Sequence, residues 1–398
     1  MKYRTYPYRW VVLGVFMLTN LTIQILWISY APVTSISAAF YNVSDIRIGL
    51  LSMSFMIAFI PFSIPSSMAI DNWGLKKSVG LGAVVMSIFA VIRGFAGQNY
   101  TTVLISTFGI AAAQPLLLNS WTTVAAKWFA DNQKATAVGL ITLANLTGTA
   151  IGMVLTPLLL EKGICINKIQ LYYGFLAVIS AVLFLLLAKD KPVQPPSENA
   201  DKTRALMMEG LKNAFGSIKF RYTLAVAFAG LGIFNGISTW IENIIKPRGF
   251  SPTDAGITGA VMLLGGLTGA VIIPFFSDKE QKRQKYLYIS IAGAIPGVLG
   301  LAFAPSYLFL ILSAFILGFF LVSALPVAMQ YAAEVTFPTP EGTSNGLIQL
   351  FGQGAVVFVY IMSAVKTKNG SFTPAMLLSV LLLAASLFFV SRMKDKEN

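Results

Sequence analysis

Residues 67–77 read SMAIDNWGLKK, and this short polar stretch joins two long apolar runs, residues 46–70 and 76–96. An α-helix needs about 20 mostly apolar residues to cross the hydrocarbon core of a bilayer, and each run meets that length. Asp71 follows the first run, and Lys76 and Lys77 begin the second. The stretch therefore predicts a tight connection between two membrane-spanning helices.

The composition of the whole chain agrees with a membrane protein. Of its 398 residues, 56% are hydrophobic and 11% are charged, whereas a soluble domain carries roughly 25% charged residues. This excludes a soluble enzyme, a disordered chain and a fibrous protein, so we expect no enzymatic activity and no cofactor. The chain has no histidine and one cysteine, Cys165. These counts exclude an imidazole proton relay or metal ligand, a disulfide within the chain and a thiolate metal cluster.

The hydrophobic runs predict an all-α membrane protein with twelve transmembrane helices. The first run follows the basic N-terminal residues and is too long to be the apolar part of a signal peptide. The first, fourth and seventh runs are long enough to tilt or to extend past the bilayer. The predicted spans are residues 9–39, 46–70, 76–96, 100–126, 134–159, 169–188, 218–246, 252–276, 284–304, 306–332, 340–364 and 372–392.

The basic residues predict the orientation. With both termini inside, the inner segments hold 21 Lys and Arg residues and the outer segments hold 8 of the total of 29. Lys and Arg accumulate on cytoplasmic loops, so both termini are expected to be cytoplasmic in a cell membrane. The net charge of +13 then reflects the excess of Lys and Arg on the cytoplasmic segments of a protein whose spans face lipid. We therefore expect no nucleic-acid partner.

A polar stretch divides the spans into two sets of six. Residues 189–217 are the predicted cytoplasmic linker between an N-terminal six-helix bundle, residues 1–188, and a C-terminal one, residues 218–398. Two pairs of similar residues are separated by the same number of positions in the chain. Asp71 and Asp278 are 278 − 71 = 207 residues apart. The stretches GLITL, which begins at residue 139, and GLIQL, which begins at residue 346, are also 346 − 139 = 207 residues apart. The shared offset indicates duplication of a six-span unit, and therefore two pseudo-symmetric bundles.

The stretch at residues 67–77 resembles the loop motif of the major facilitator superfamily, Gly-x-x-x-Asp-x-x-Gly-x-Arg/Lys, with Ser67 in place of the first glycine. An acid at a helix end can pair with a basic residue or a helix N-terminus in one conformation and be released in the other. The alternative is that these are solvated loop charges. The predicted gating residues are Asp71, Gly74, Lys77 and, in the second half, Asp278.

Ionisable residues inside or near the spans are the candidates for coupling. Arg93 lies near the outer end of span three, Glu242 in the outer half of span seven and Glu334 at the inner end of span ten. Glu242 has either a substrate or cation role, or it is a charge at the rim of the membrane. Tight proton coupling is not supported, because span four has no basic residue and the chain has no histidine.

Aromatic and amide side chains within the spans suggest a substrate site. Trp27 and Phe234 stand at the same offset, 234 − 27 = 207. Two ring faces with neutral amides would suit an organic cation rather than an anion. The alternative is that the aromatic residues only pack between helices. The candidate substrate-binding residues are Trp27, Tyr30, Gln114, Phe234, Asn235, Trp240, Gln349 and Gln353.

Scattered motifs also resemble the feline leukaemia virus subgroup C receptor-related transporters, a branch of the major facilitator superfamily. The more specific matches are Leu51-Ser52-Met53 and residues 340–344, PEGTS. The resemblance implies facilitated movement of choline or ethanolamine, with haem also proposed for the family. It implies a cation site at Trp27, Gln114 and Gln353, but the family tyrosine of span seven is Asn235 here.

We therefore expect a monomeric transporter of a small organic cation or amine that works by alternating access without an obligatory proton step. One alternative is a transporter of a neutral or anionic metabolite, for which Arg93 would be essential. Haem is a further alternative, although no histidine is present to ligate its iron. A receptor without transport is the third, but the chain carries no sizeable soluble segment.

Overall fold

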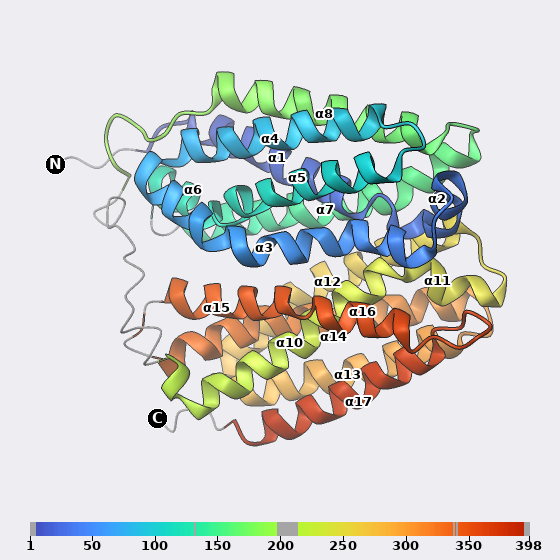
Figure 1. Ribbon diagram of the computed structural model, residues 1–398. Helices are drawn as coiled ribbons and strands as arrows, with labels where there is room; N and C mark the ends of the chain where they lie inside the picture. The colour runs from blue at the N-terminus through green and yellow to red at the C-terminus, as the bar shows by residue number, and fades with distance from the viewer. Residues whose placement is uncertain (1–4, 131–132, 197–213, 337–338, 340, 394–398) are drawn as a thin grey trace. The chain divides into compact units, whose positions relative to one another are not determined.

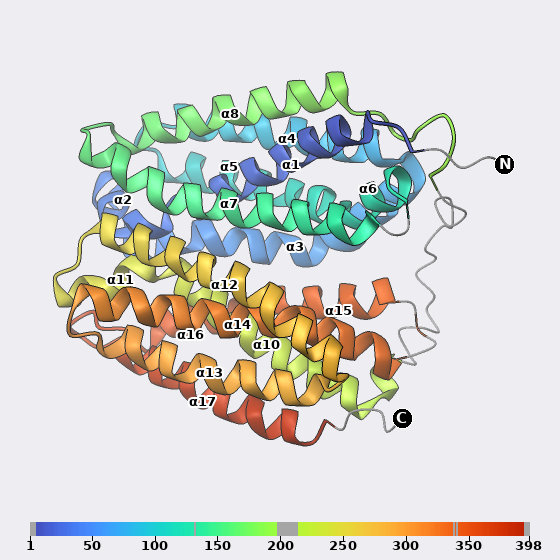
Figure 2. The ribbon, with the colours of Figure 1, turned by 180° about the vertical axis from the view of Figure 1, so that it is seen from behind.

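The computed structural model describes residues 5–130, 133–196, 214–336, 339 and 341–393. The chain divides into two compact units, residues 1–204 and 205–398. Much of the predicted linker, residues 197–213, lies outside the described residues. Figures 1 and 2 show the helices of each unit from the front and from behind.

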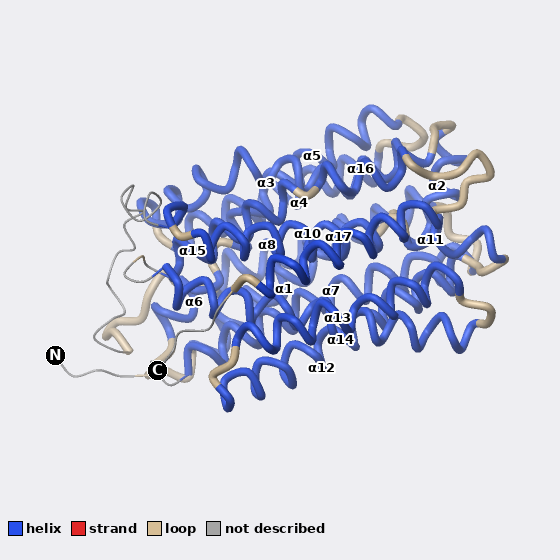
Figure 3. Tube along the Cα trace, turned by 90° about the horizontal axis from the view of Figure 1, so that it is seen from below, coloured by secondary structure: helices blue, strands red, loops and turns tan. Residues whose placement is uncertain are grey.

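The described residues are helices and the loops between them, without a strand (Figure 3). Twelve helical segments among them are long and apolar enough to cross a membrane, which confirms the predicted fold class. The first unit contains α1 (Arg9–Ile28), η1 (Ala31–Val33), α2 (Thr34–Tyr41), α3 (Asp45–Trp73), α4 (Leu75–Phe95), α5 (Tyr100–Leu118), α6 (Trp121–Trp128), α7 (Lys134–Glu161) and α8 (Ile166–Leu187). The second unit contains α10 (Ile218–Thr239), α11 (Ile241–Ile245), η3 (Lys246–Arg248), α12 (Pro252–Glu280), α13 (Arg283–Phe303), α14 (Tyr307–Thr336), α15 (Glu341–Gly354), α16 (Val356–Ala364) and α17 (Thr373–Ser391).

The two units pack their helices in the same order, as a duplicated six-span unit requires. In the first unit α1 packs on α7, α3 on α5, and α4 on both α5 and α8. In the second unit the corresponding contacts are α10 with α15, α12 with α14, and α13 with both α14 and α17. The repeat that the 207-residue offset predicts is therefore present in the packing.

Glycines allow several of these helices to touch backbone to backbone. A Cβ on Gly148 of α7 would collide with the Leu21 carbonyl of α1, and a Cβ on Gly269 of α12 would collide with the Phe319 carbonyl of α14. Small residues at such crossings favour helix association in membranes, because they bring the main chains close enough for dispersion contacts.

Spans one, four, seven and eleven are each interrupted by a break. Pro32 lies in the single turn η1 that separates α1 from α2, and Asn119 and Ser120 separate α5 from α6. Trp240 (φ −102°, ψ 17°) separates α10 from α11, and Ala355 separates α15 from α16. Tilt or overhang was expected to account for the length of spans one, four and seven. The structure shows two consecutive helical segments in each of these spans, and their tilt or overhang stays a prediction.

Candidate functional site

Three polar or aromatic side chains form a stripe along α1, which we call the α1 stripe: Asn20, Gln24 and Trp27. Their spacing of i, i+4 and i+7 places them on one face of the helix. Asn20 accepts a hydrogen bond from Trp121 Nε1 of α6 at 2.7 Å, which fixes its end of the stripe. Gln24 is buried, and its Oε1 has no hydrogen-bond partner among the described residues. Trp27 is half-buried and lies beside the break that follows α1.

Gln114 lies on α5 directly before Pro115, near the end of that helix. Proline has no amide hydrogen, so Pro115 cannot bond to the Ala111 carbonyl and weakens the helix there. The break that follows is fastened to α3, because Asn119 Nδ2 donates to the Ser63 carbonyl at 3.1 Å and to Ser67 Oγ at 3.0 Å. Ser67 stands where the loop motif has glycine, and this contact gives its hydroxyl a structural role.

The second unit carries its candidates beside two more breaks. Phe234 and Asn235 lie in the last two turns of α10, where Phe234 is half-buried and Asn235 is buried. On α15, Asn345, Gln349 and Gln353 form a second stripe, the α15 stripe, at spacings of i, i+4 and i+8. All three amides are half-buried, and Gln353 lies two residues before Ala355.

The side chain of Trp240 is buried and contacts other residues of the second unit. Its exposed fraction is 0%, its Nε1 donates to the Val359 carbonyl at 2.9 Å, and its ring lies 5.5 Å from that of Phe372. Because both the ring and the N–H have partners, Trp240 braces the α10–α11 break against α16 and the start of α17. Its predicted contact with substrate stays a prediction.

Arg93 and Tyr30, predicted for different roles, lie against each other inside the first unit. The guanidinium of Arg93 lies over the Tyr30 ring, 5.5 Å from its centroid, and Nη1 donates to the Leu26 carbonyl at 3.1 Å. The Tyr30 and Tyr41 hydroxyls are 3.0 Å apart. Glu242, in the first turn of α11, is buried at the break beside Trp240.

The predicted gating motif forms a joint at one end of the first unit, which we call the Asp190 joint. Asp190, after α8, accepts from the Lys76 amide at the start of α4 at 3.2 Å and pairs with Lys127 Nζ of α6 at 3.2 Å. Gly74 adopts φ +82°, and a Cβ on it would lie 2.5 Å from Asp190 Oδ1. Asp71 and Lys77 are exposed on either side of this turn. The acid that occupies the α4 N-terminus is therefore Asp190.

The second unit has a joint at the corresponding place, the Arg283 joint, with an arginine at its centre. The buried Arg283 side chain pairs with Asp278, donates to Ser277 Oγ at 3.1 Å, and pairs through Nε with Glu334 Oε1 at 3.1 Å. The positions correspond by the repeat offset, since 283 − 207 = 76 and 334 − 207 = 127. Arg283 therefore corresponds to Lys76 and keeps its positive charge, whereas Glu334 corresponds to Lys127 and has the opposite charge.

Sequence reasoning missed Asp190 and Arg283 as the centres of these joints. Asp190 was read as part of the linker, although an acid between Lys189 and Lys191 directly after a span was the available signal. Arg283 is not among the predicted gating residues. Its offset of 207 from Lys76 could have identified it.

Two bundles of six spans that pack in one repeated order, with a break in each of the corresponding spans one and seven, are typical of the class of secondary transporters. The sequence pattern of the Major Facilitator Superfamily matches residues 12–360 and, in a second match, residues 248–397. The chain therefore belongs to the major facilitator superfamily, and it is a multi-pass membrane transporter of small solutes.

Known proteins agree with this assignment. Solute carrier family 49 member A3 of Xenopus tropicalis is 29% identical over 368 residues, covering 88% of this chain and 76% of that protein. A choline/ethanolamine transporter of Danio rerio is 27% identical over 408 residues, covering 96% of this chain and 86% of that protein. A bacterial homologue of the human lysosomal transporter Spinster, solved in an inward-facing and unoccupied conformation, has a TM-score of 0.77 at 16% identity. It covers 99% of this chain and 100% of that chain, and the likeness shows the fold.

Proposed function

We propose that the transported solute is a small organic cation or amine of the choline and ethanolamine class, moved by facilitated alternating access. The observation that carries the proposal is the position of the aromatic and amide candidates beside helix breaks. Trp27, Gln114 and Gln353 each lie within a few residues of a break in a span, as do Phe234 and Asn235. The breaks of spans one and seven, beside Trp27 and beside Phe234, occupy corresponding places of the two repeats. Broken spans of this kind are where secondary transporters hold their substrates.

The chemistry of these side chains supports a cation. Trp27 and Phe234 offer ring faces that attract a quaternary ammonium, and the oxygens of Gln114 and Gln353 can accept a hydrogen bond from a hydroxyl or an amine. Gln24, with its unpartnered Oε1 one turn before Trp27, is a further acceptor. The names of several relatives, choline/ethanolamine transporters, support the same class of solute.

The direct test is uptake of labelled choline and ethanolamine into liposomes that contain the purified protein. Trp27→Ala should lower the uptake about tenfold or more, since a desolvated cation–π contact contributes about 2 kcal/mol. Trp10→Ala, at the half-exposed start of the same helix, is the control and should retain uptake. A wild-type protein that gives no saturable uptake of either compound would overturn the proposal.

Position 235, which is asparagine in this chain and tyrosine in the family that it resembles, provides a second test. If the family tyrosine contributes a ring face to the cation, Asn235→Tyr should lower the KM for choline several-fold. Asn235→Gln, which keeps the amide, is the matched control and should leave the KM close to that of the wild type. Equal KM values in all three proteins would remove position 235 from the proposed site.

We also propose a monomer in a cell membrane with both termini on the cytoplasmic side. The excess of Lys and Arg on the segments that share a side with the termini, 21 against 8, supports this orientation. The Asp190 and Arg283 joints, with Asp71 and Lys77 beside the first, would then lie on the cytoplasmic side. We assign these joints to holding α3–α4 and α12–α13 in place while the units move.

A further inference from the structure

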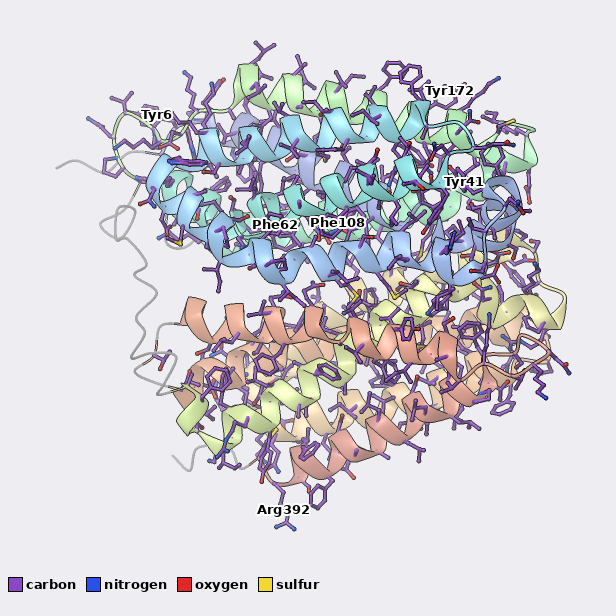
Figure 4. All side chains as sticks on the ribbon, viewed as in Figure 1. Tyr6, Tyr41, Phe62, Phe108, Tyr172 and Arg392 are labelled. Carbon is purple, nitrogen blue, oxygen red and sulfur yellow. The ribbon has the colours of Figure 1, made fainter. Side chains whose placement is uncertain are left out.

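Arg93 is the most deeply buried cation of the first unit's described residues, with an exposed fraction of 0%. It lies near the end of α4, and Figure 4 shows Tyr41, the hydrogen-bond partner of Tyr30, at the α2 end of the same unit. One edge of the guanidinium is occupied by the Leu26 carbonyl, and one face is covered by the Tyr30 ring. The remaining edge, Nε with Nη2, has no such contact.

Nε and Nη2 are both buried and have no hydrogen-bond partner among the described residues. The ion pairs of the described part of the chain join other residues, so no carboxylate lies within 4.0 Å of Arg93 there. A buried charge without a counter-charge destabilises a protein by several kcal/mol. The two N–H bonds on this edge therefore point to a bound group that accepts hydrogen bonds and carries negative charge.

The surrounding groups are neutral hydrogen-bond donors. The groups that interact electrostatically with Arg93 are the phenols of Tyr30, Tyr41 and Tyr173. The Tyr30–Tyr41 hydroxyl pair shares one hydrogen bond, so one of its two protons remains free to donate. A fixed guanidinium together with a hydroxyl proton is a suitable donor set for a halide ion.

The packing around Arg93 favours a small ion over an organic one. A Cβ on the adjacent Gly94 would lie 2.5 Å from Leu171 Cα, so α4 and α8 are in direct contact there. Leu26 of α1 and Tyr30, in the break between α1 and η1, cover the other side. An organic carboxylate would have to displace one of these helices, whereas a single-atom anion needs only the free edge of the guanidinium.

We propose that Nε and Nη2 of Arg93 bind a small monovalent inorganic anion of the halide class inside the first unit. The anion neutralises the buried charge and holds the end of α4 to the broken end of α1. It is distinct from the transported solute, and the inference does not depend on the proposed choline-type site.

The test uses the purified full-length protein in detergent at constant ionic strength. Replacing sodium gluconate by sodium chloride or bromide should raise the Tm by several degrees, and the rise should saturate with concentration. Crystals grown in bromide should show anomalous scattering from one ion at the Arg93 guanidinium. Identical Tm values in chloride and gluconate, or bromide bound only elsewhere, would overturn the proposal.

Variants separate anion binding from a purely structural role. Arg93→Gln should abolish the chloride-dependent shift in Tm, while Arg47→Gln, which removes an exposed guanidinium of the same unit, should keep it. Tyr30→Phe retains the guanidinium and the ring, and it should raise the half-saturating chloride concentration several-fold even if Arg93→Gln does not fold. Loss of the shift in Arg47→Gln, or no change in Tyr30→Phe, would contradict the proposed donor set.

Discussion

Gly74 occupies the most constrained turn of the Asp190 joint. Its φ of +82° with ψ of 173° lies in a region that side chains rarely adopt, and the Asp190 carboxylate fills the space where a Cβ would be. Glycine is needed at this turn both for its backbone conformation and for the close approach of an acid to the α4 N-terminus.

Gly74→Ala should therefore lower stability by roughly 2–4 kcal/mol, from backbone strain and displacement of Asp190. Thermal unfolding in detergent measures the loss. Gly163→Ala is the control, because Gly163 has φ +79° with nothing within 4 Å of the added Cβ, so only strain remains. In an Asp190→Ala background the loss from Gly74→Ala should shrink by about 1 kcal/mol. An unchanged loss there would show that Asp190 does not contribute.

Arg283 uses two nitrogens of its guanidinium group to bond to its three partners. Nε bonds to Glu334, and Nη1 bonds to Ser277 and Asp278. Arg283→Lys should lower stability by roughly 1–3 kcal/mol, because one ammonium cannot reproduce bonds from both Nε and Nη1. Lys285→Ala, which removes an exposed pair with Glu280 at 2.7 Å, should leave the unfolding temperature close to that of the wild type, because solvent screens exposed ion pairs. Equal unfolding temperatures for Arg283→Lys and the wild type would show that the joint needs only a positive charge.

At the scale of the helices, the contact between α12 and α14 depends on glycine. Gly269→Ala should lower stability by roughly 2–4 kcal/mol, since the added methyl meets the rigid Phe319 backbone. Gly230→Ala on α10 is the matched control, because its nearest neighbour, Leu321 Cδ1, would be 3.9 Å away. That control should be neutral or stabilising, as alanine favours helix by about 1 kcal/mol. Detergent-solubilised Tm values compare the two, and a greater loss for Gly230→Ala would contradict the packing.

The spans could be predicted from the sequence, whereas the breaks within them could not. Apolar length is a local property, and it predicts twelve spans to within a few residues of the observed bounds. The breaks at Trp240 and Ala355 depend on packing against neighbouring helices, which hydropathy does not describe. Asp190 and its partner Lys76 are 114 residues apart in the chain, so their pairing requires the fold. The roles of the substrate-site candidates remain predictions.

At the scale of the whole molecule, the single cysteine provides a test of orientation. Cys165 is exposed between α7 and α8, on a loop predicted to be outside. A membrane-impermeant maleimide should therefore label intact cells that express the wild-type protein.

Cys165→Ser should abolish that labelling, because the chain has no other cysteine. In this background Asn72→Cys, at the exposed α3–α4 turn, should label only after the cells are permeabilised. The opposite pattern would place both termini outside.

Lys127 and Glu334 occupy corresponding positions of the two joints and carry opposite charges. Neither residue can therefore replace the other in its joint. Duplication produces identical halves, so the charge at position 127 or at its counterpart 334 has since changed sign, whereas Lys76 and Arg283 have kept the same sign. A glutamate grafted onto position 127 from its counterpart at 334 would place two acids side by side next to the α4 N-terminus. A point substitution at Asp190 or at Arg283 should therefore release one joint and leave the other intact, so the contribution of each half can be measured separately.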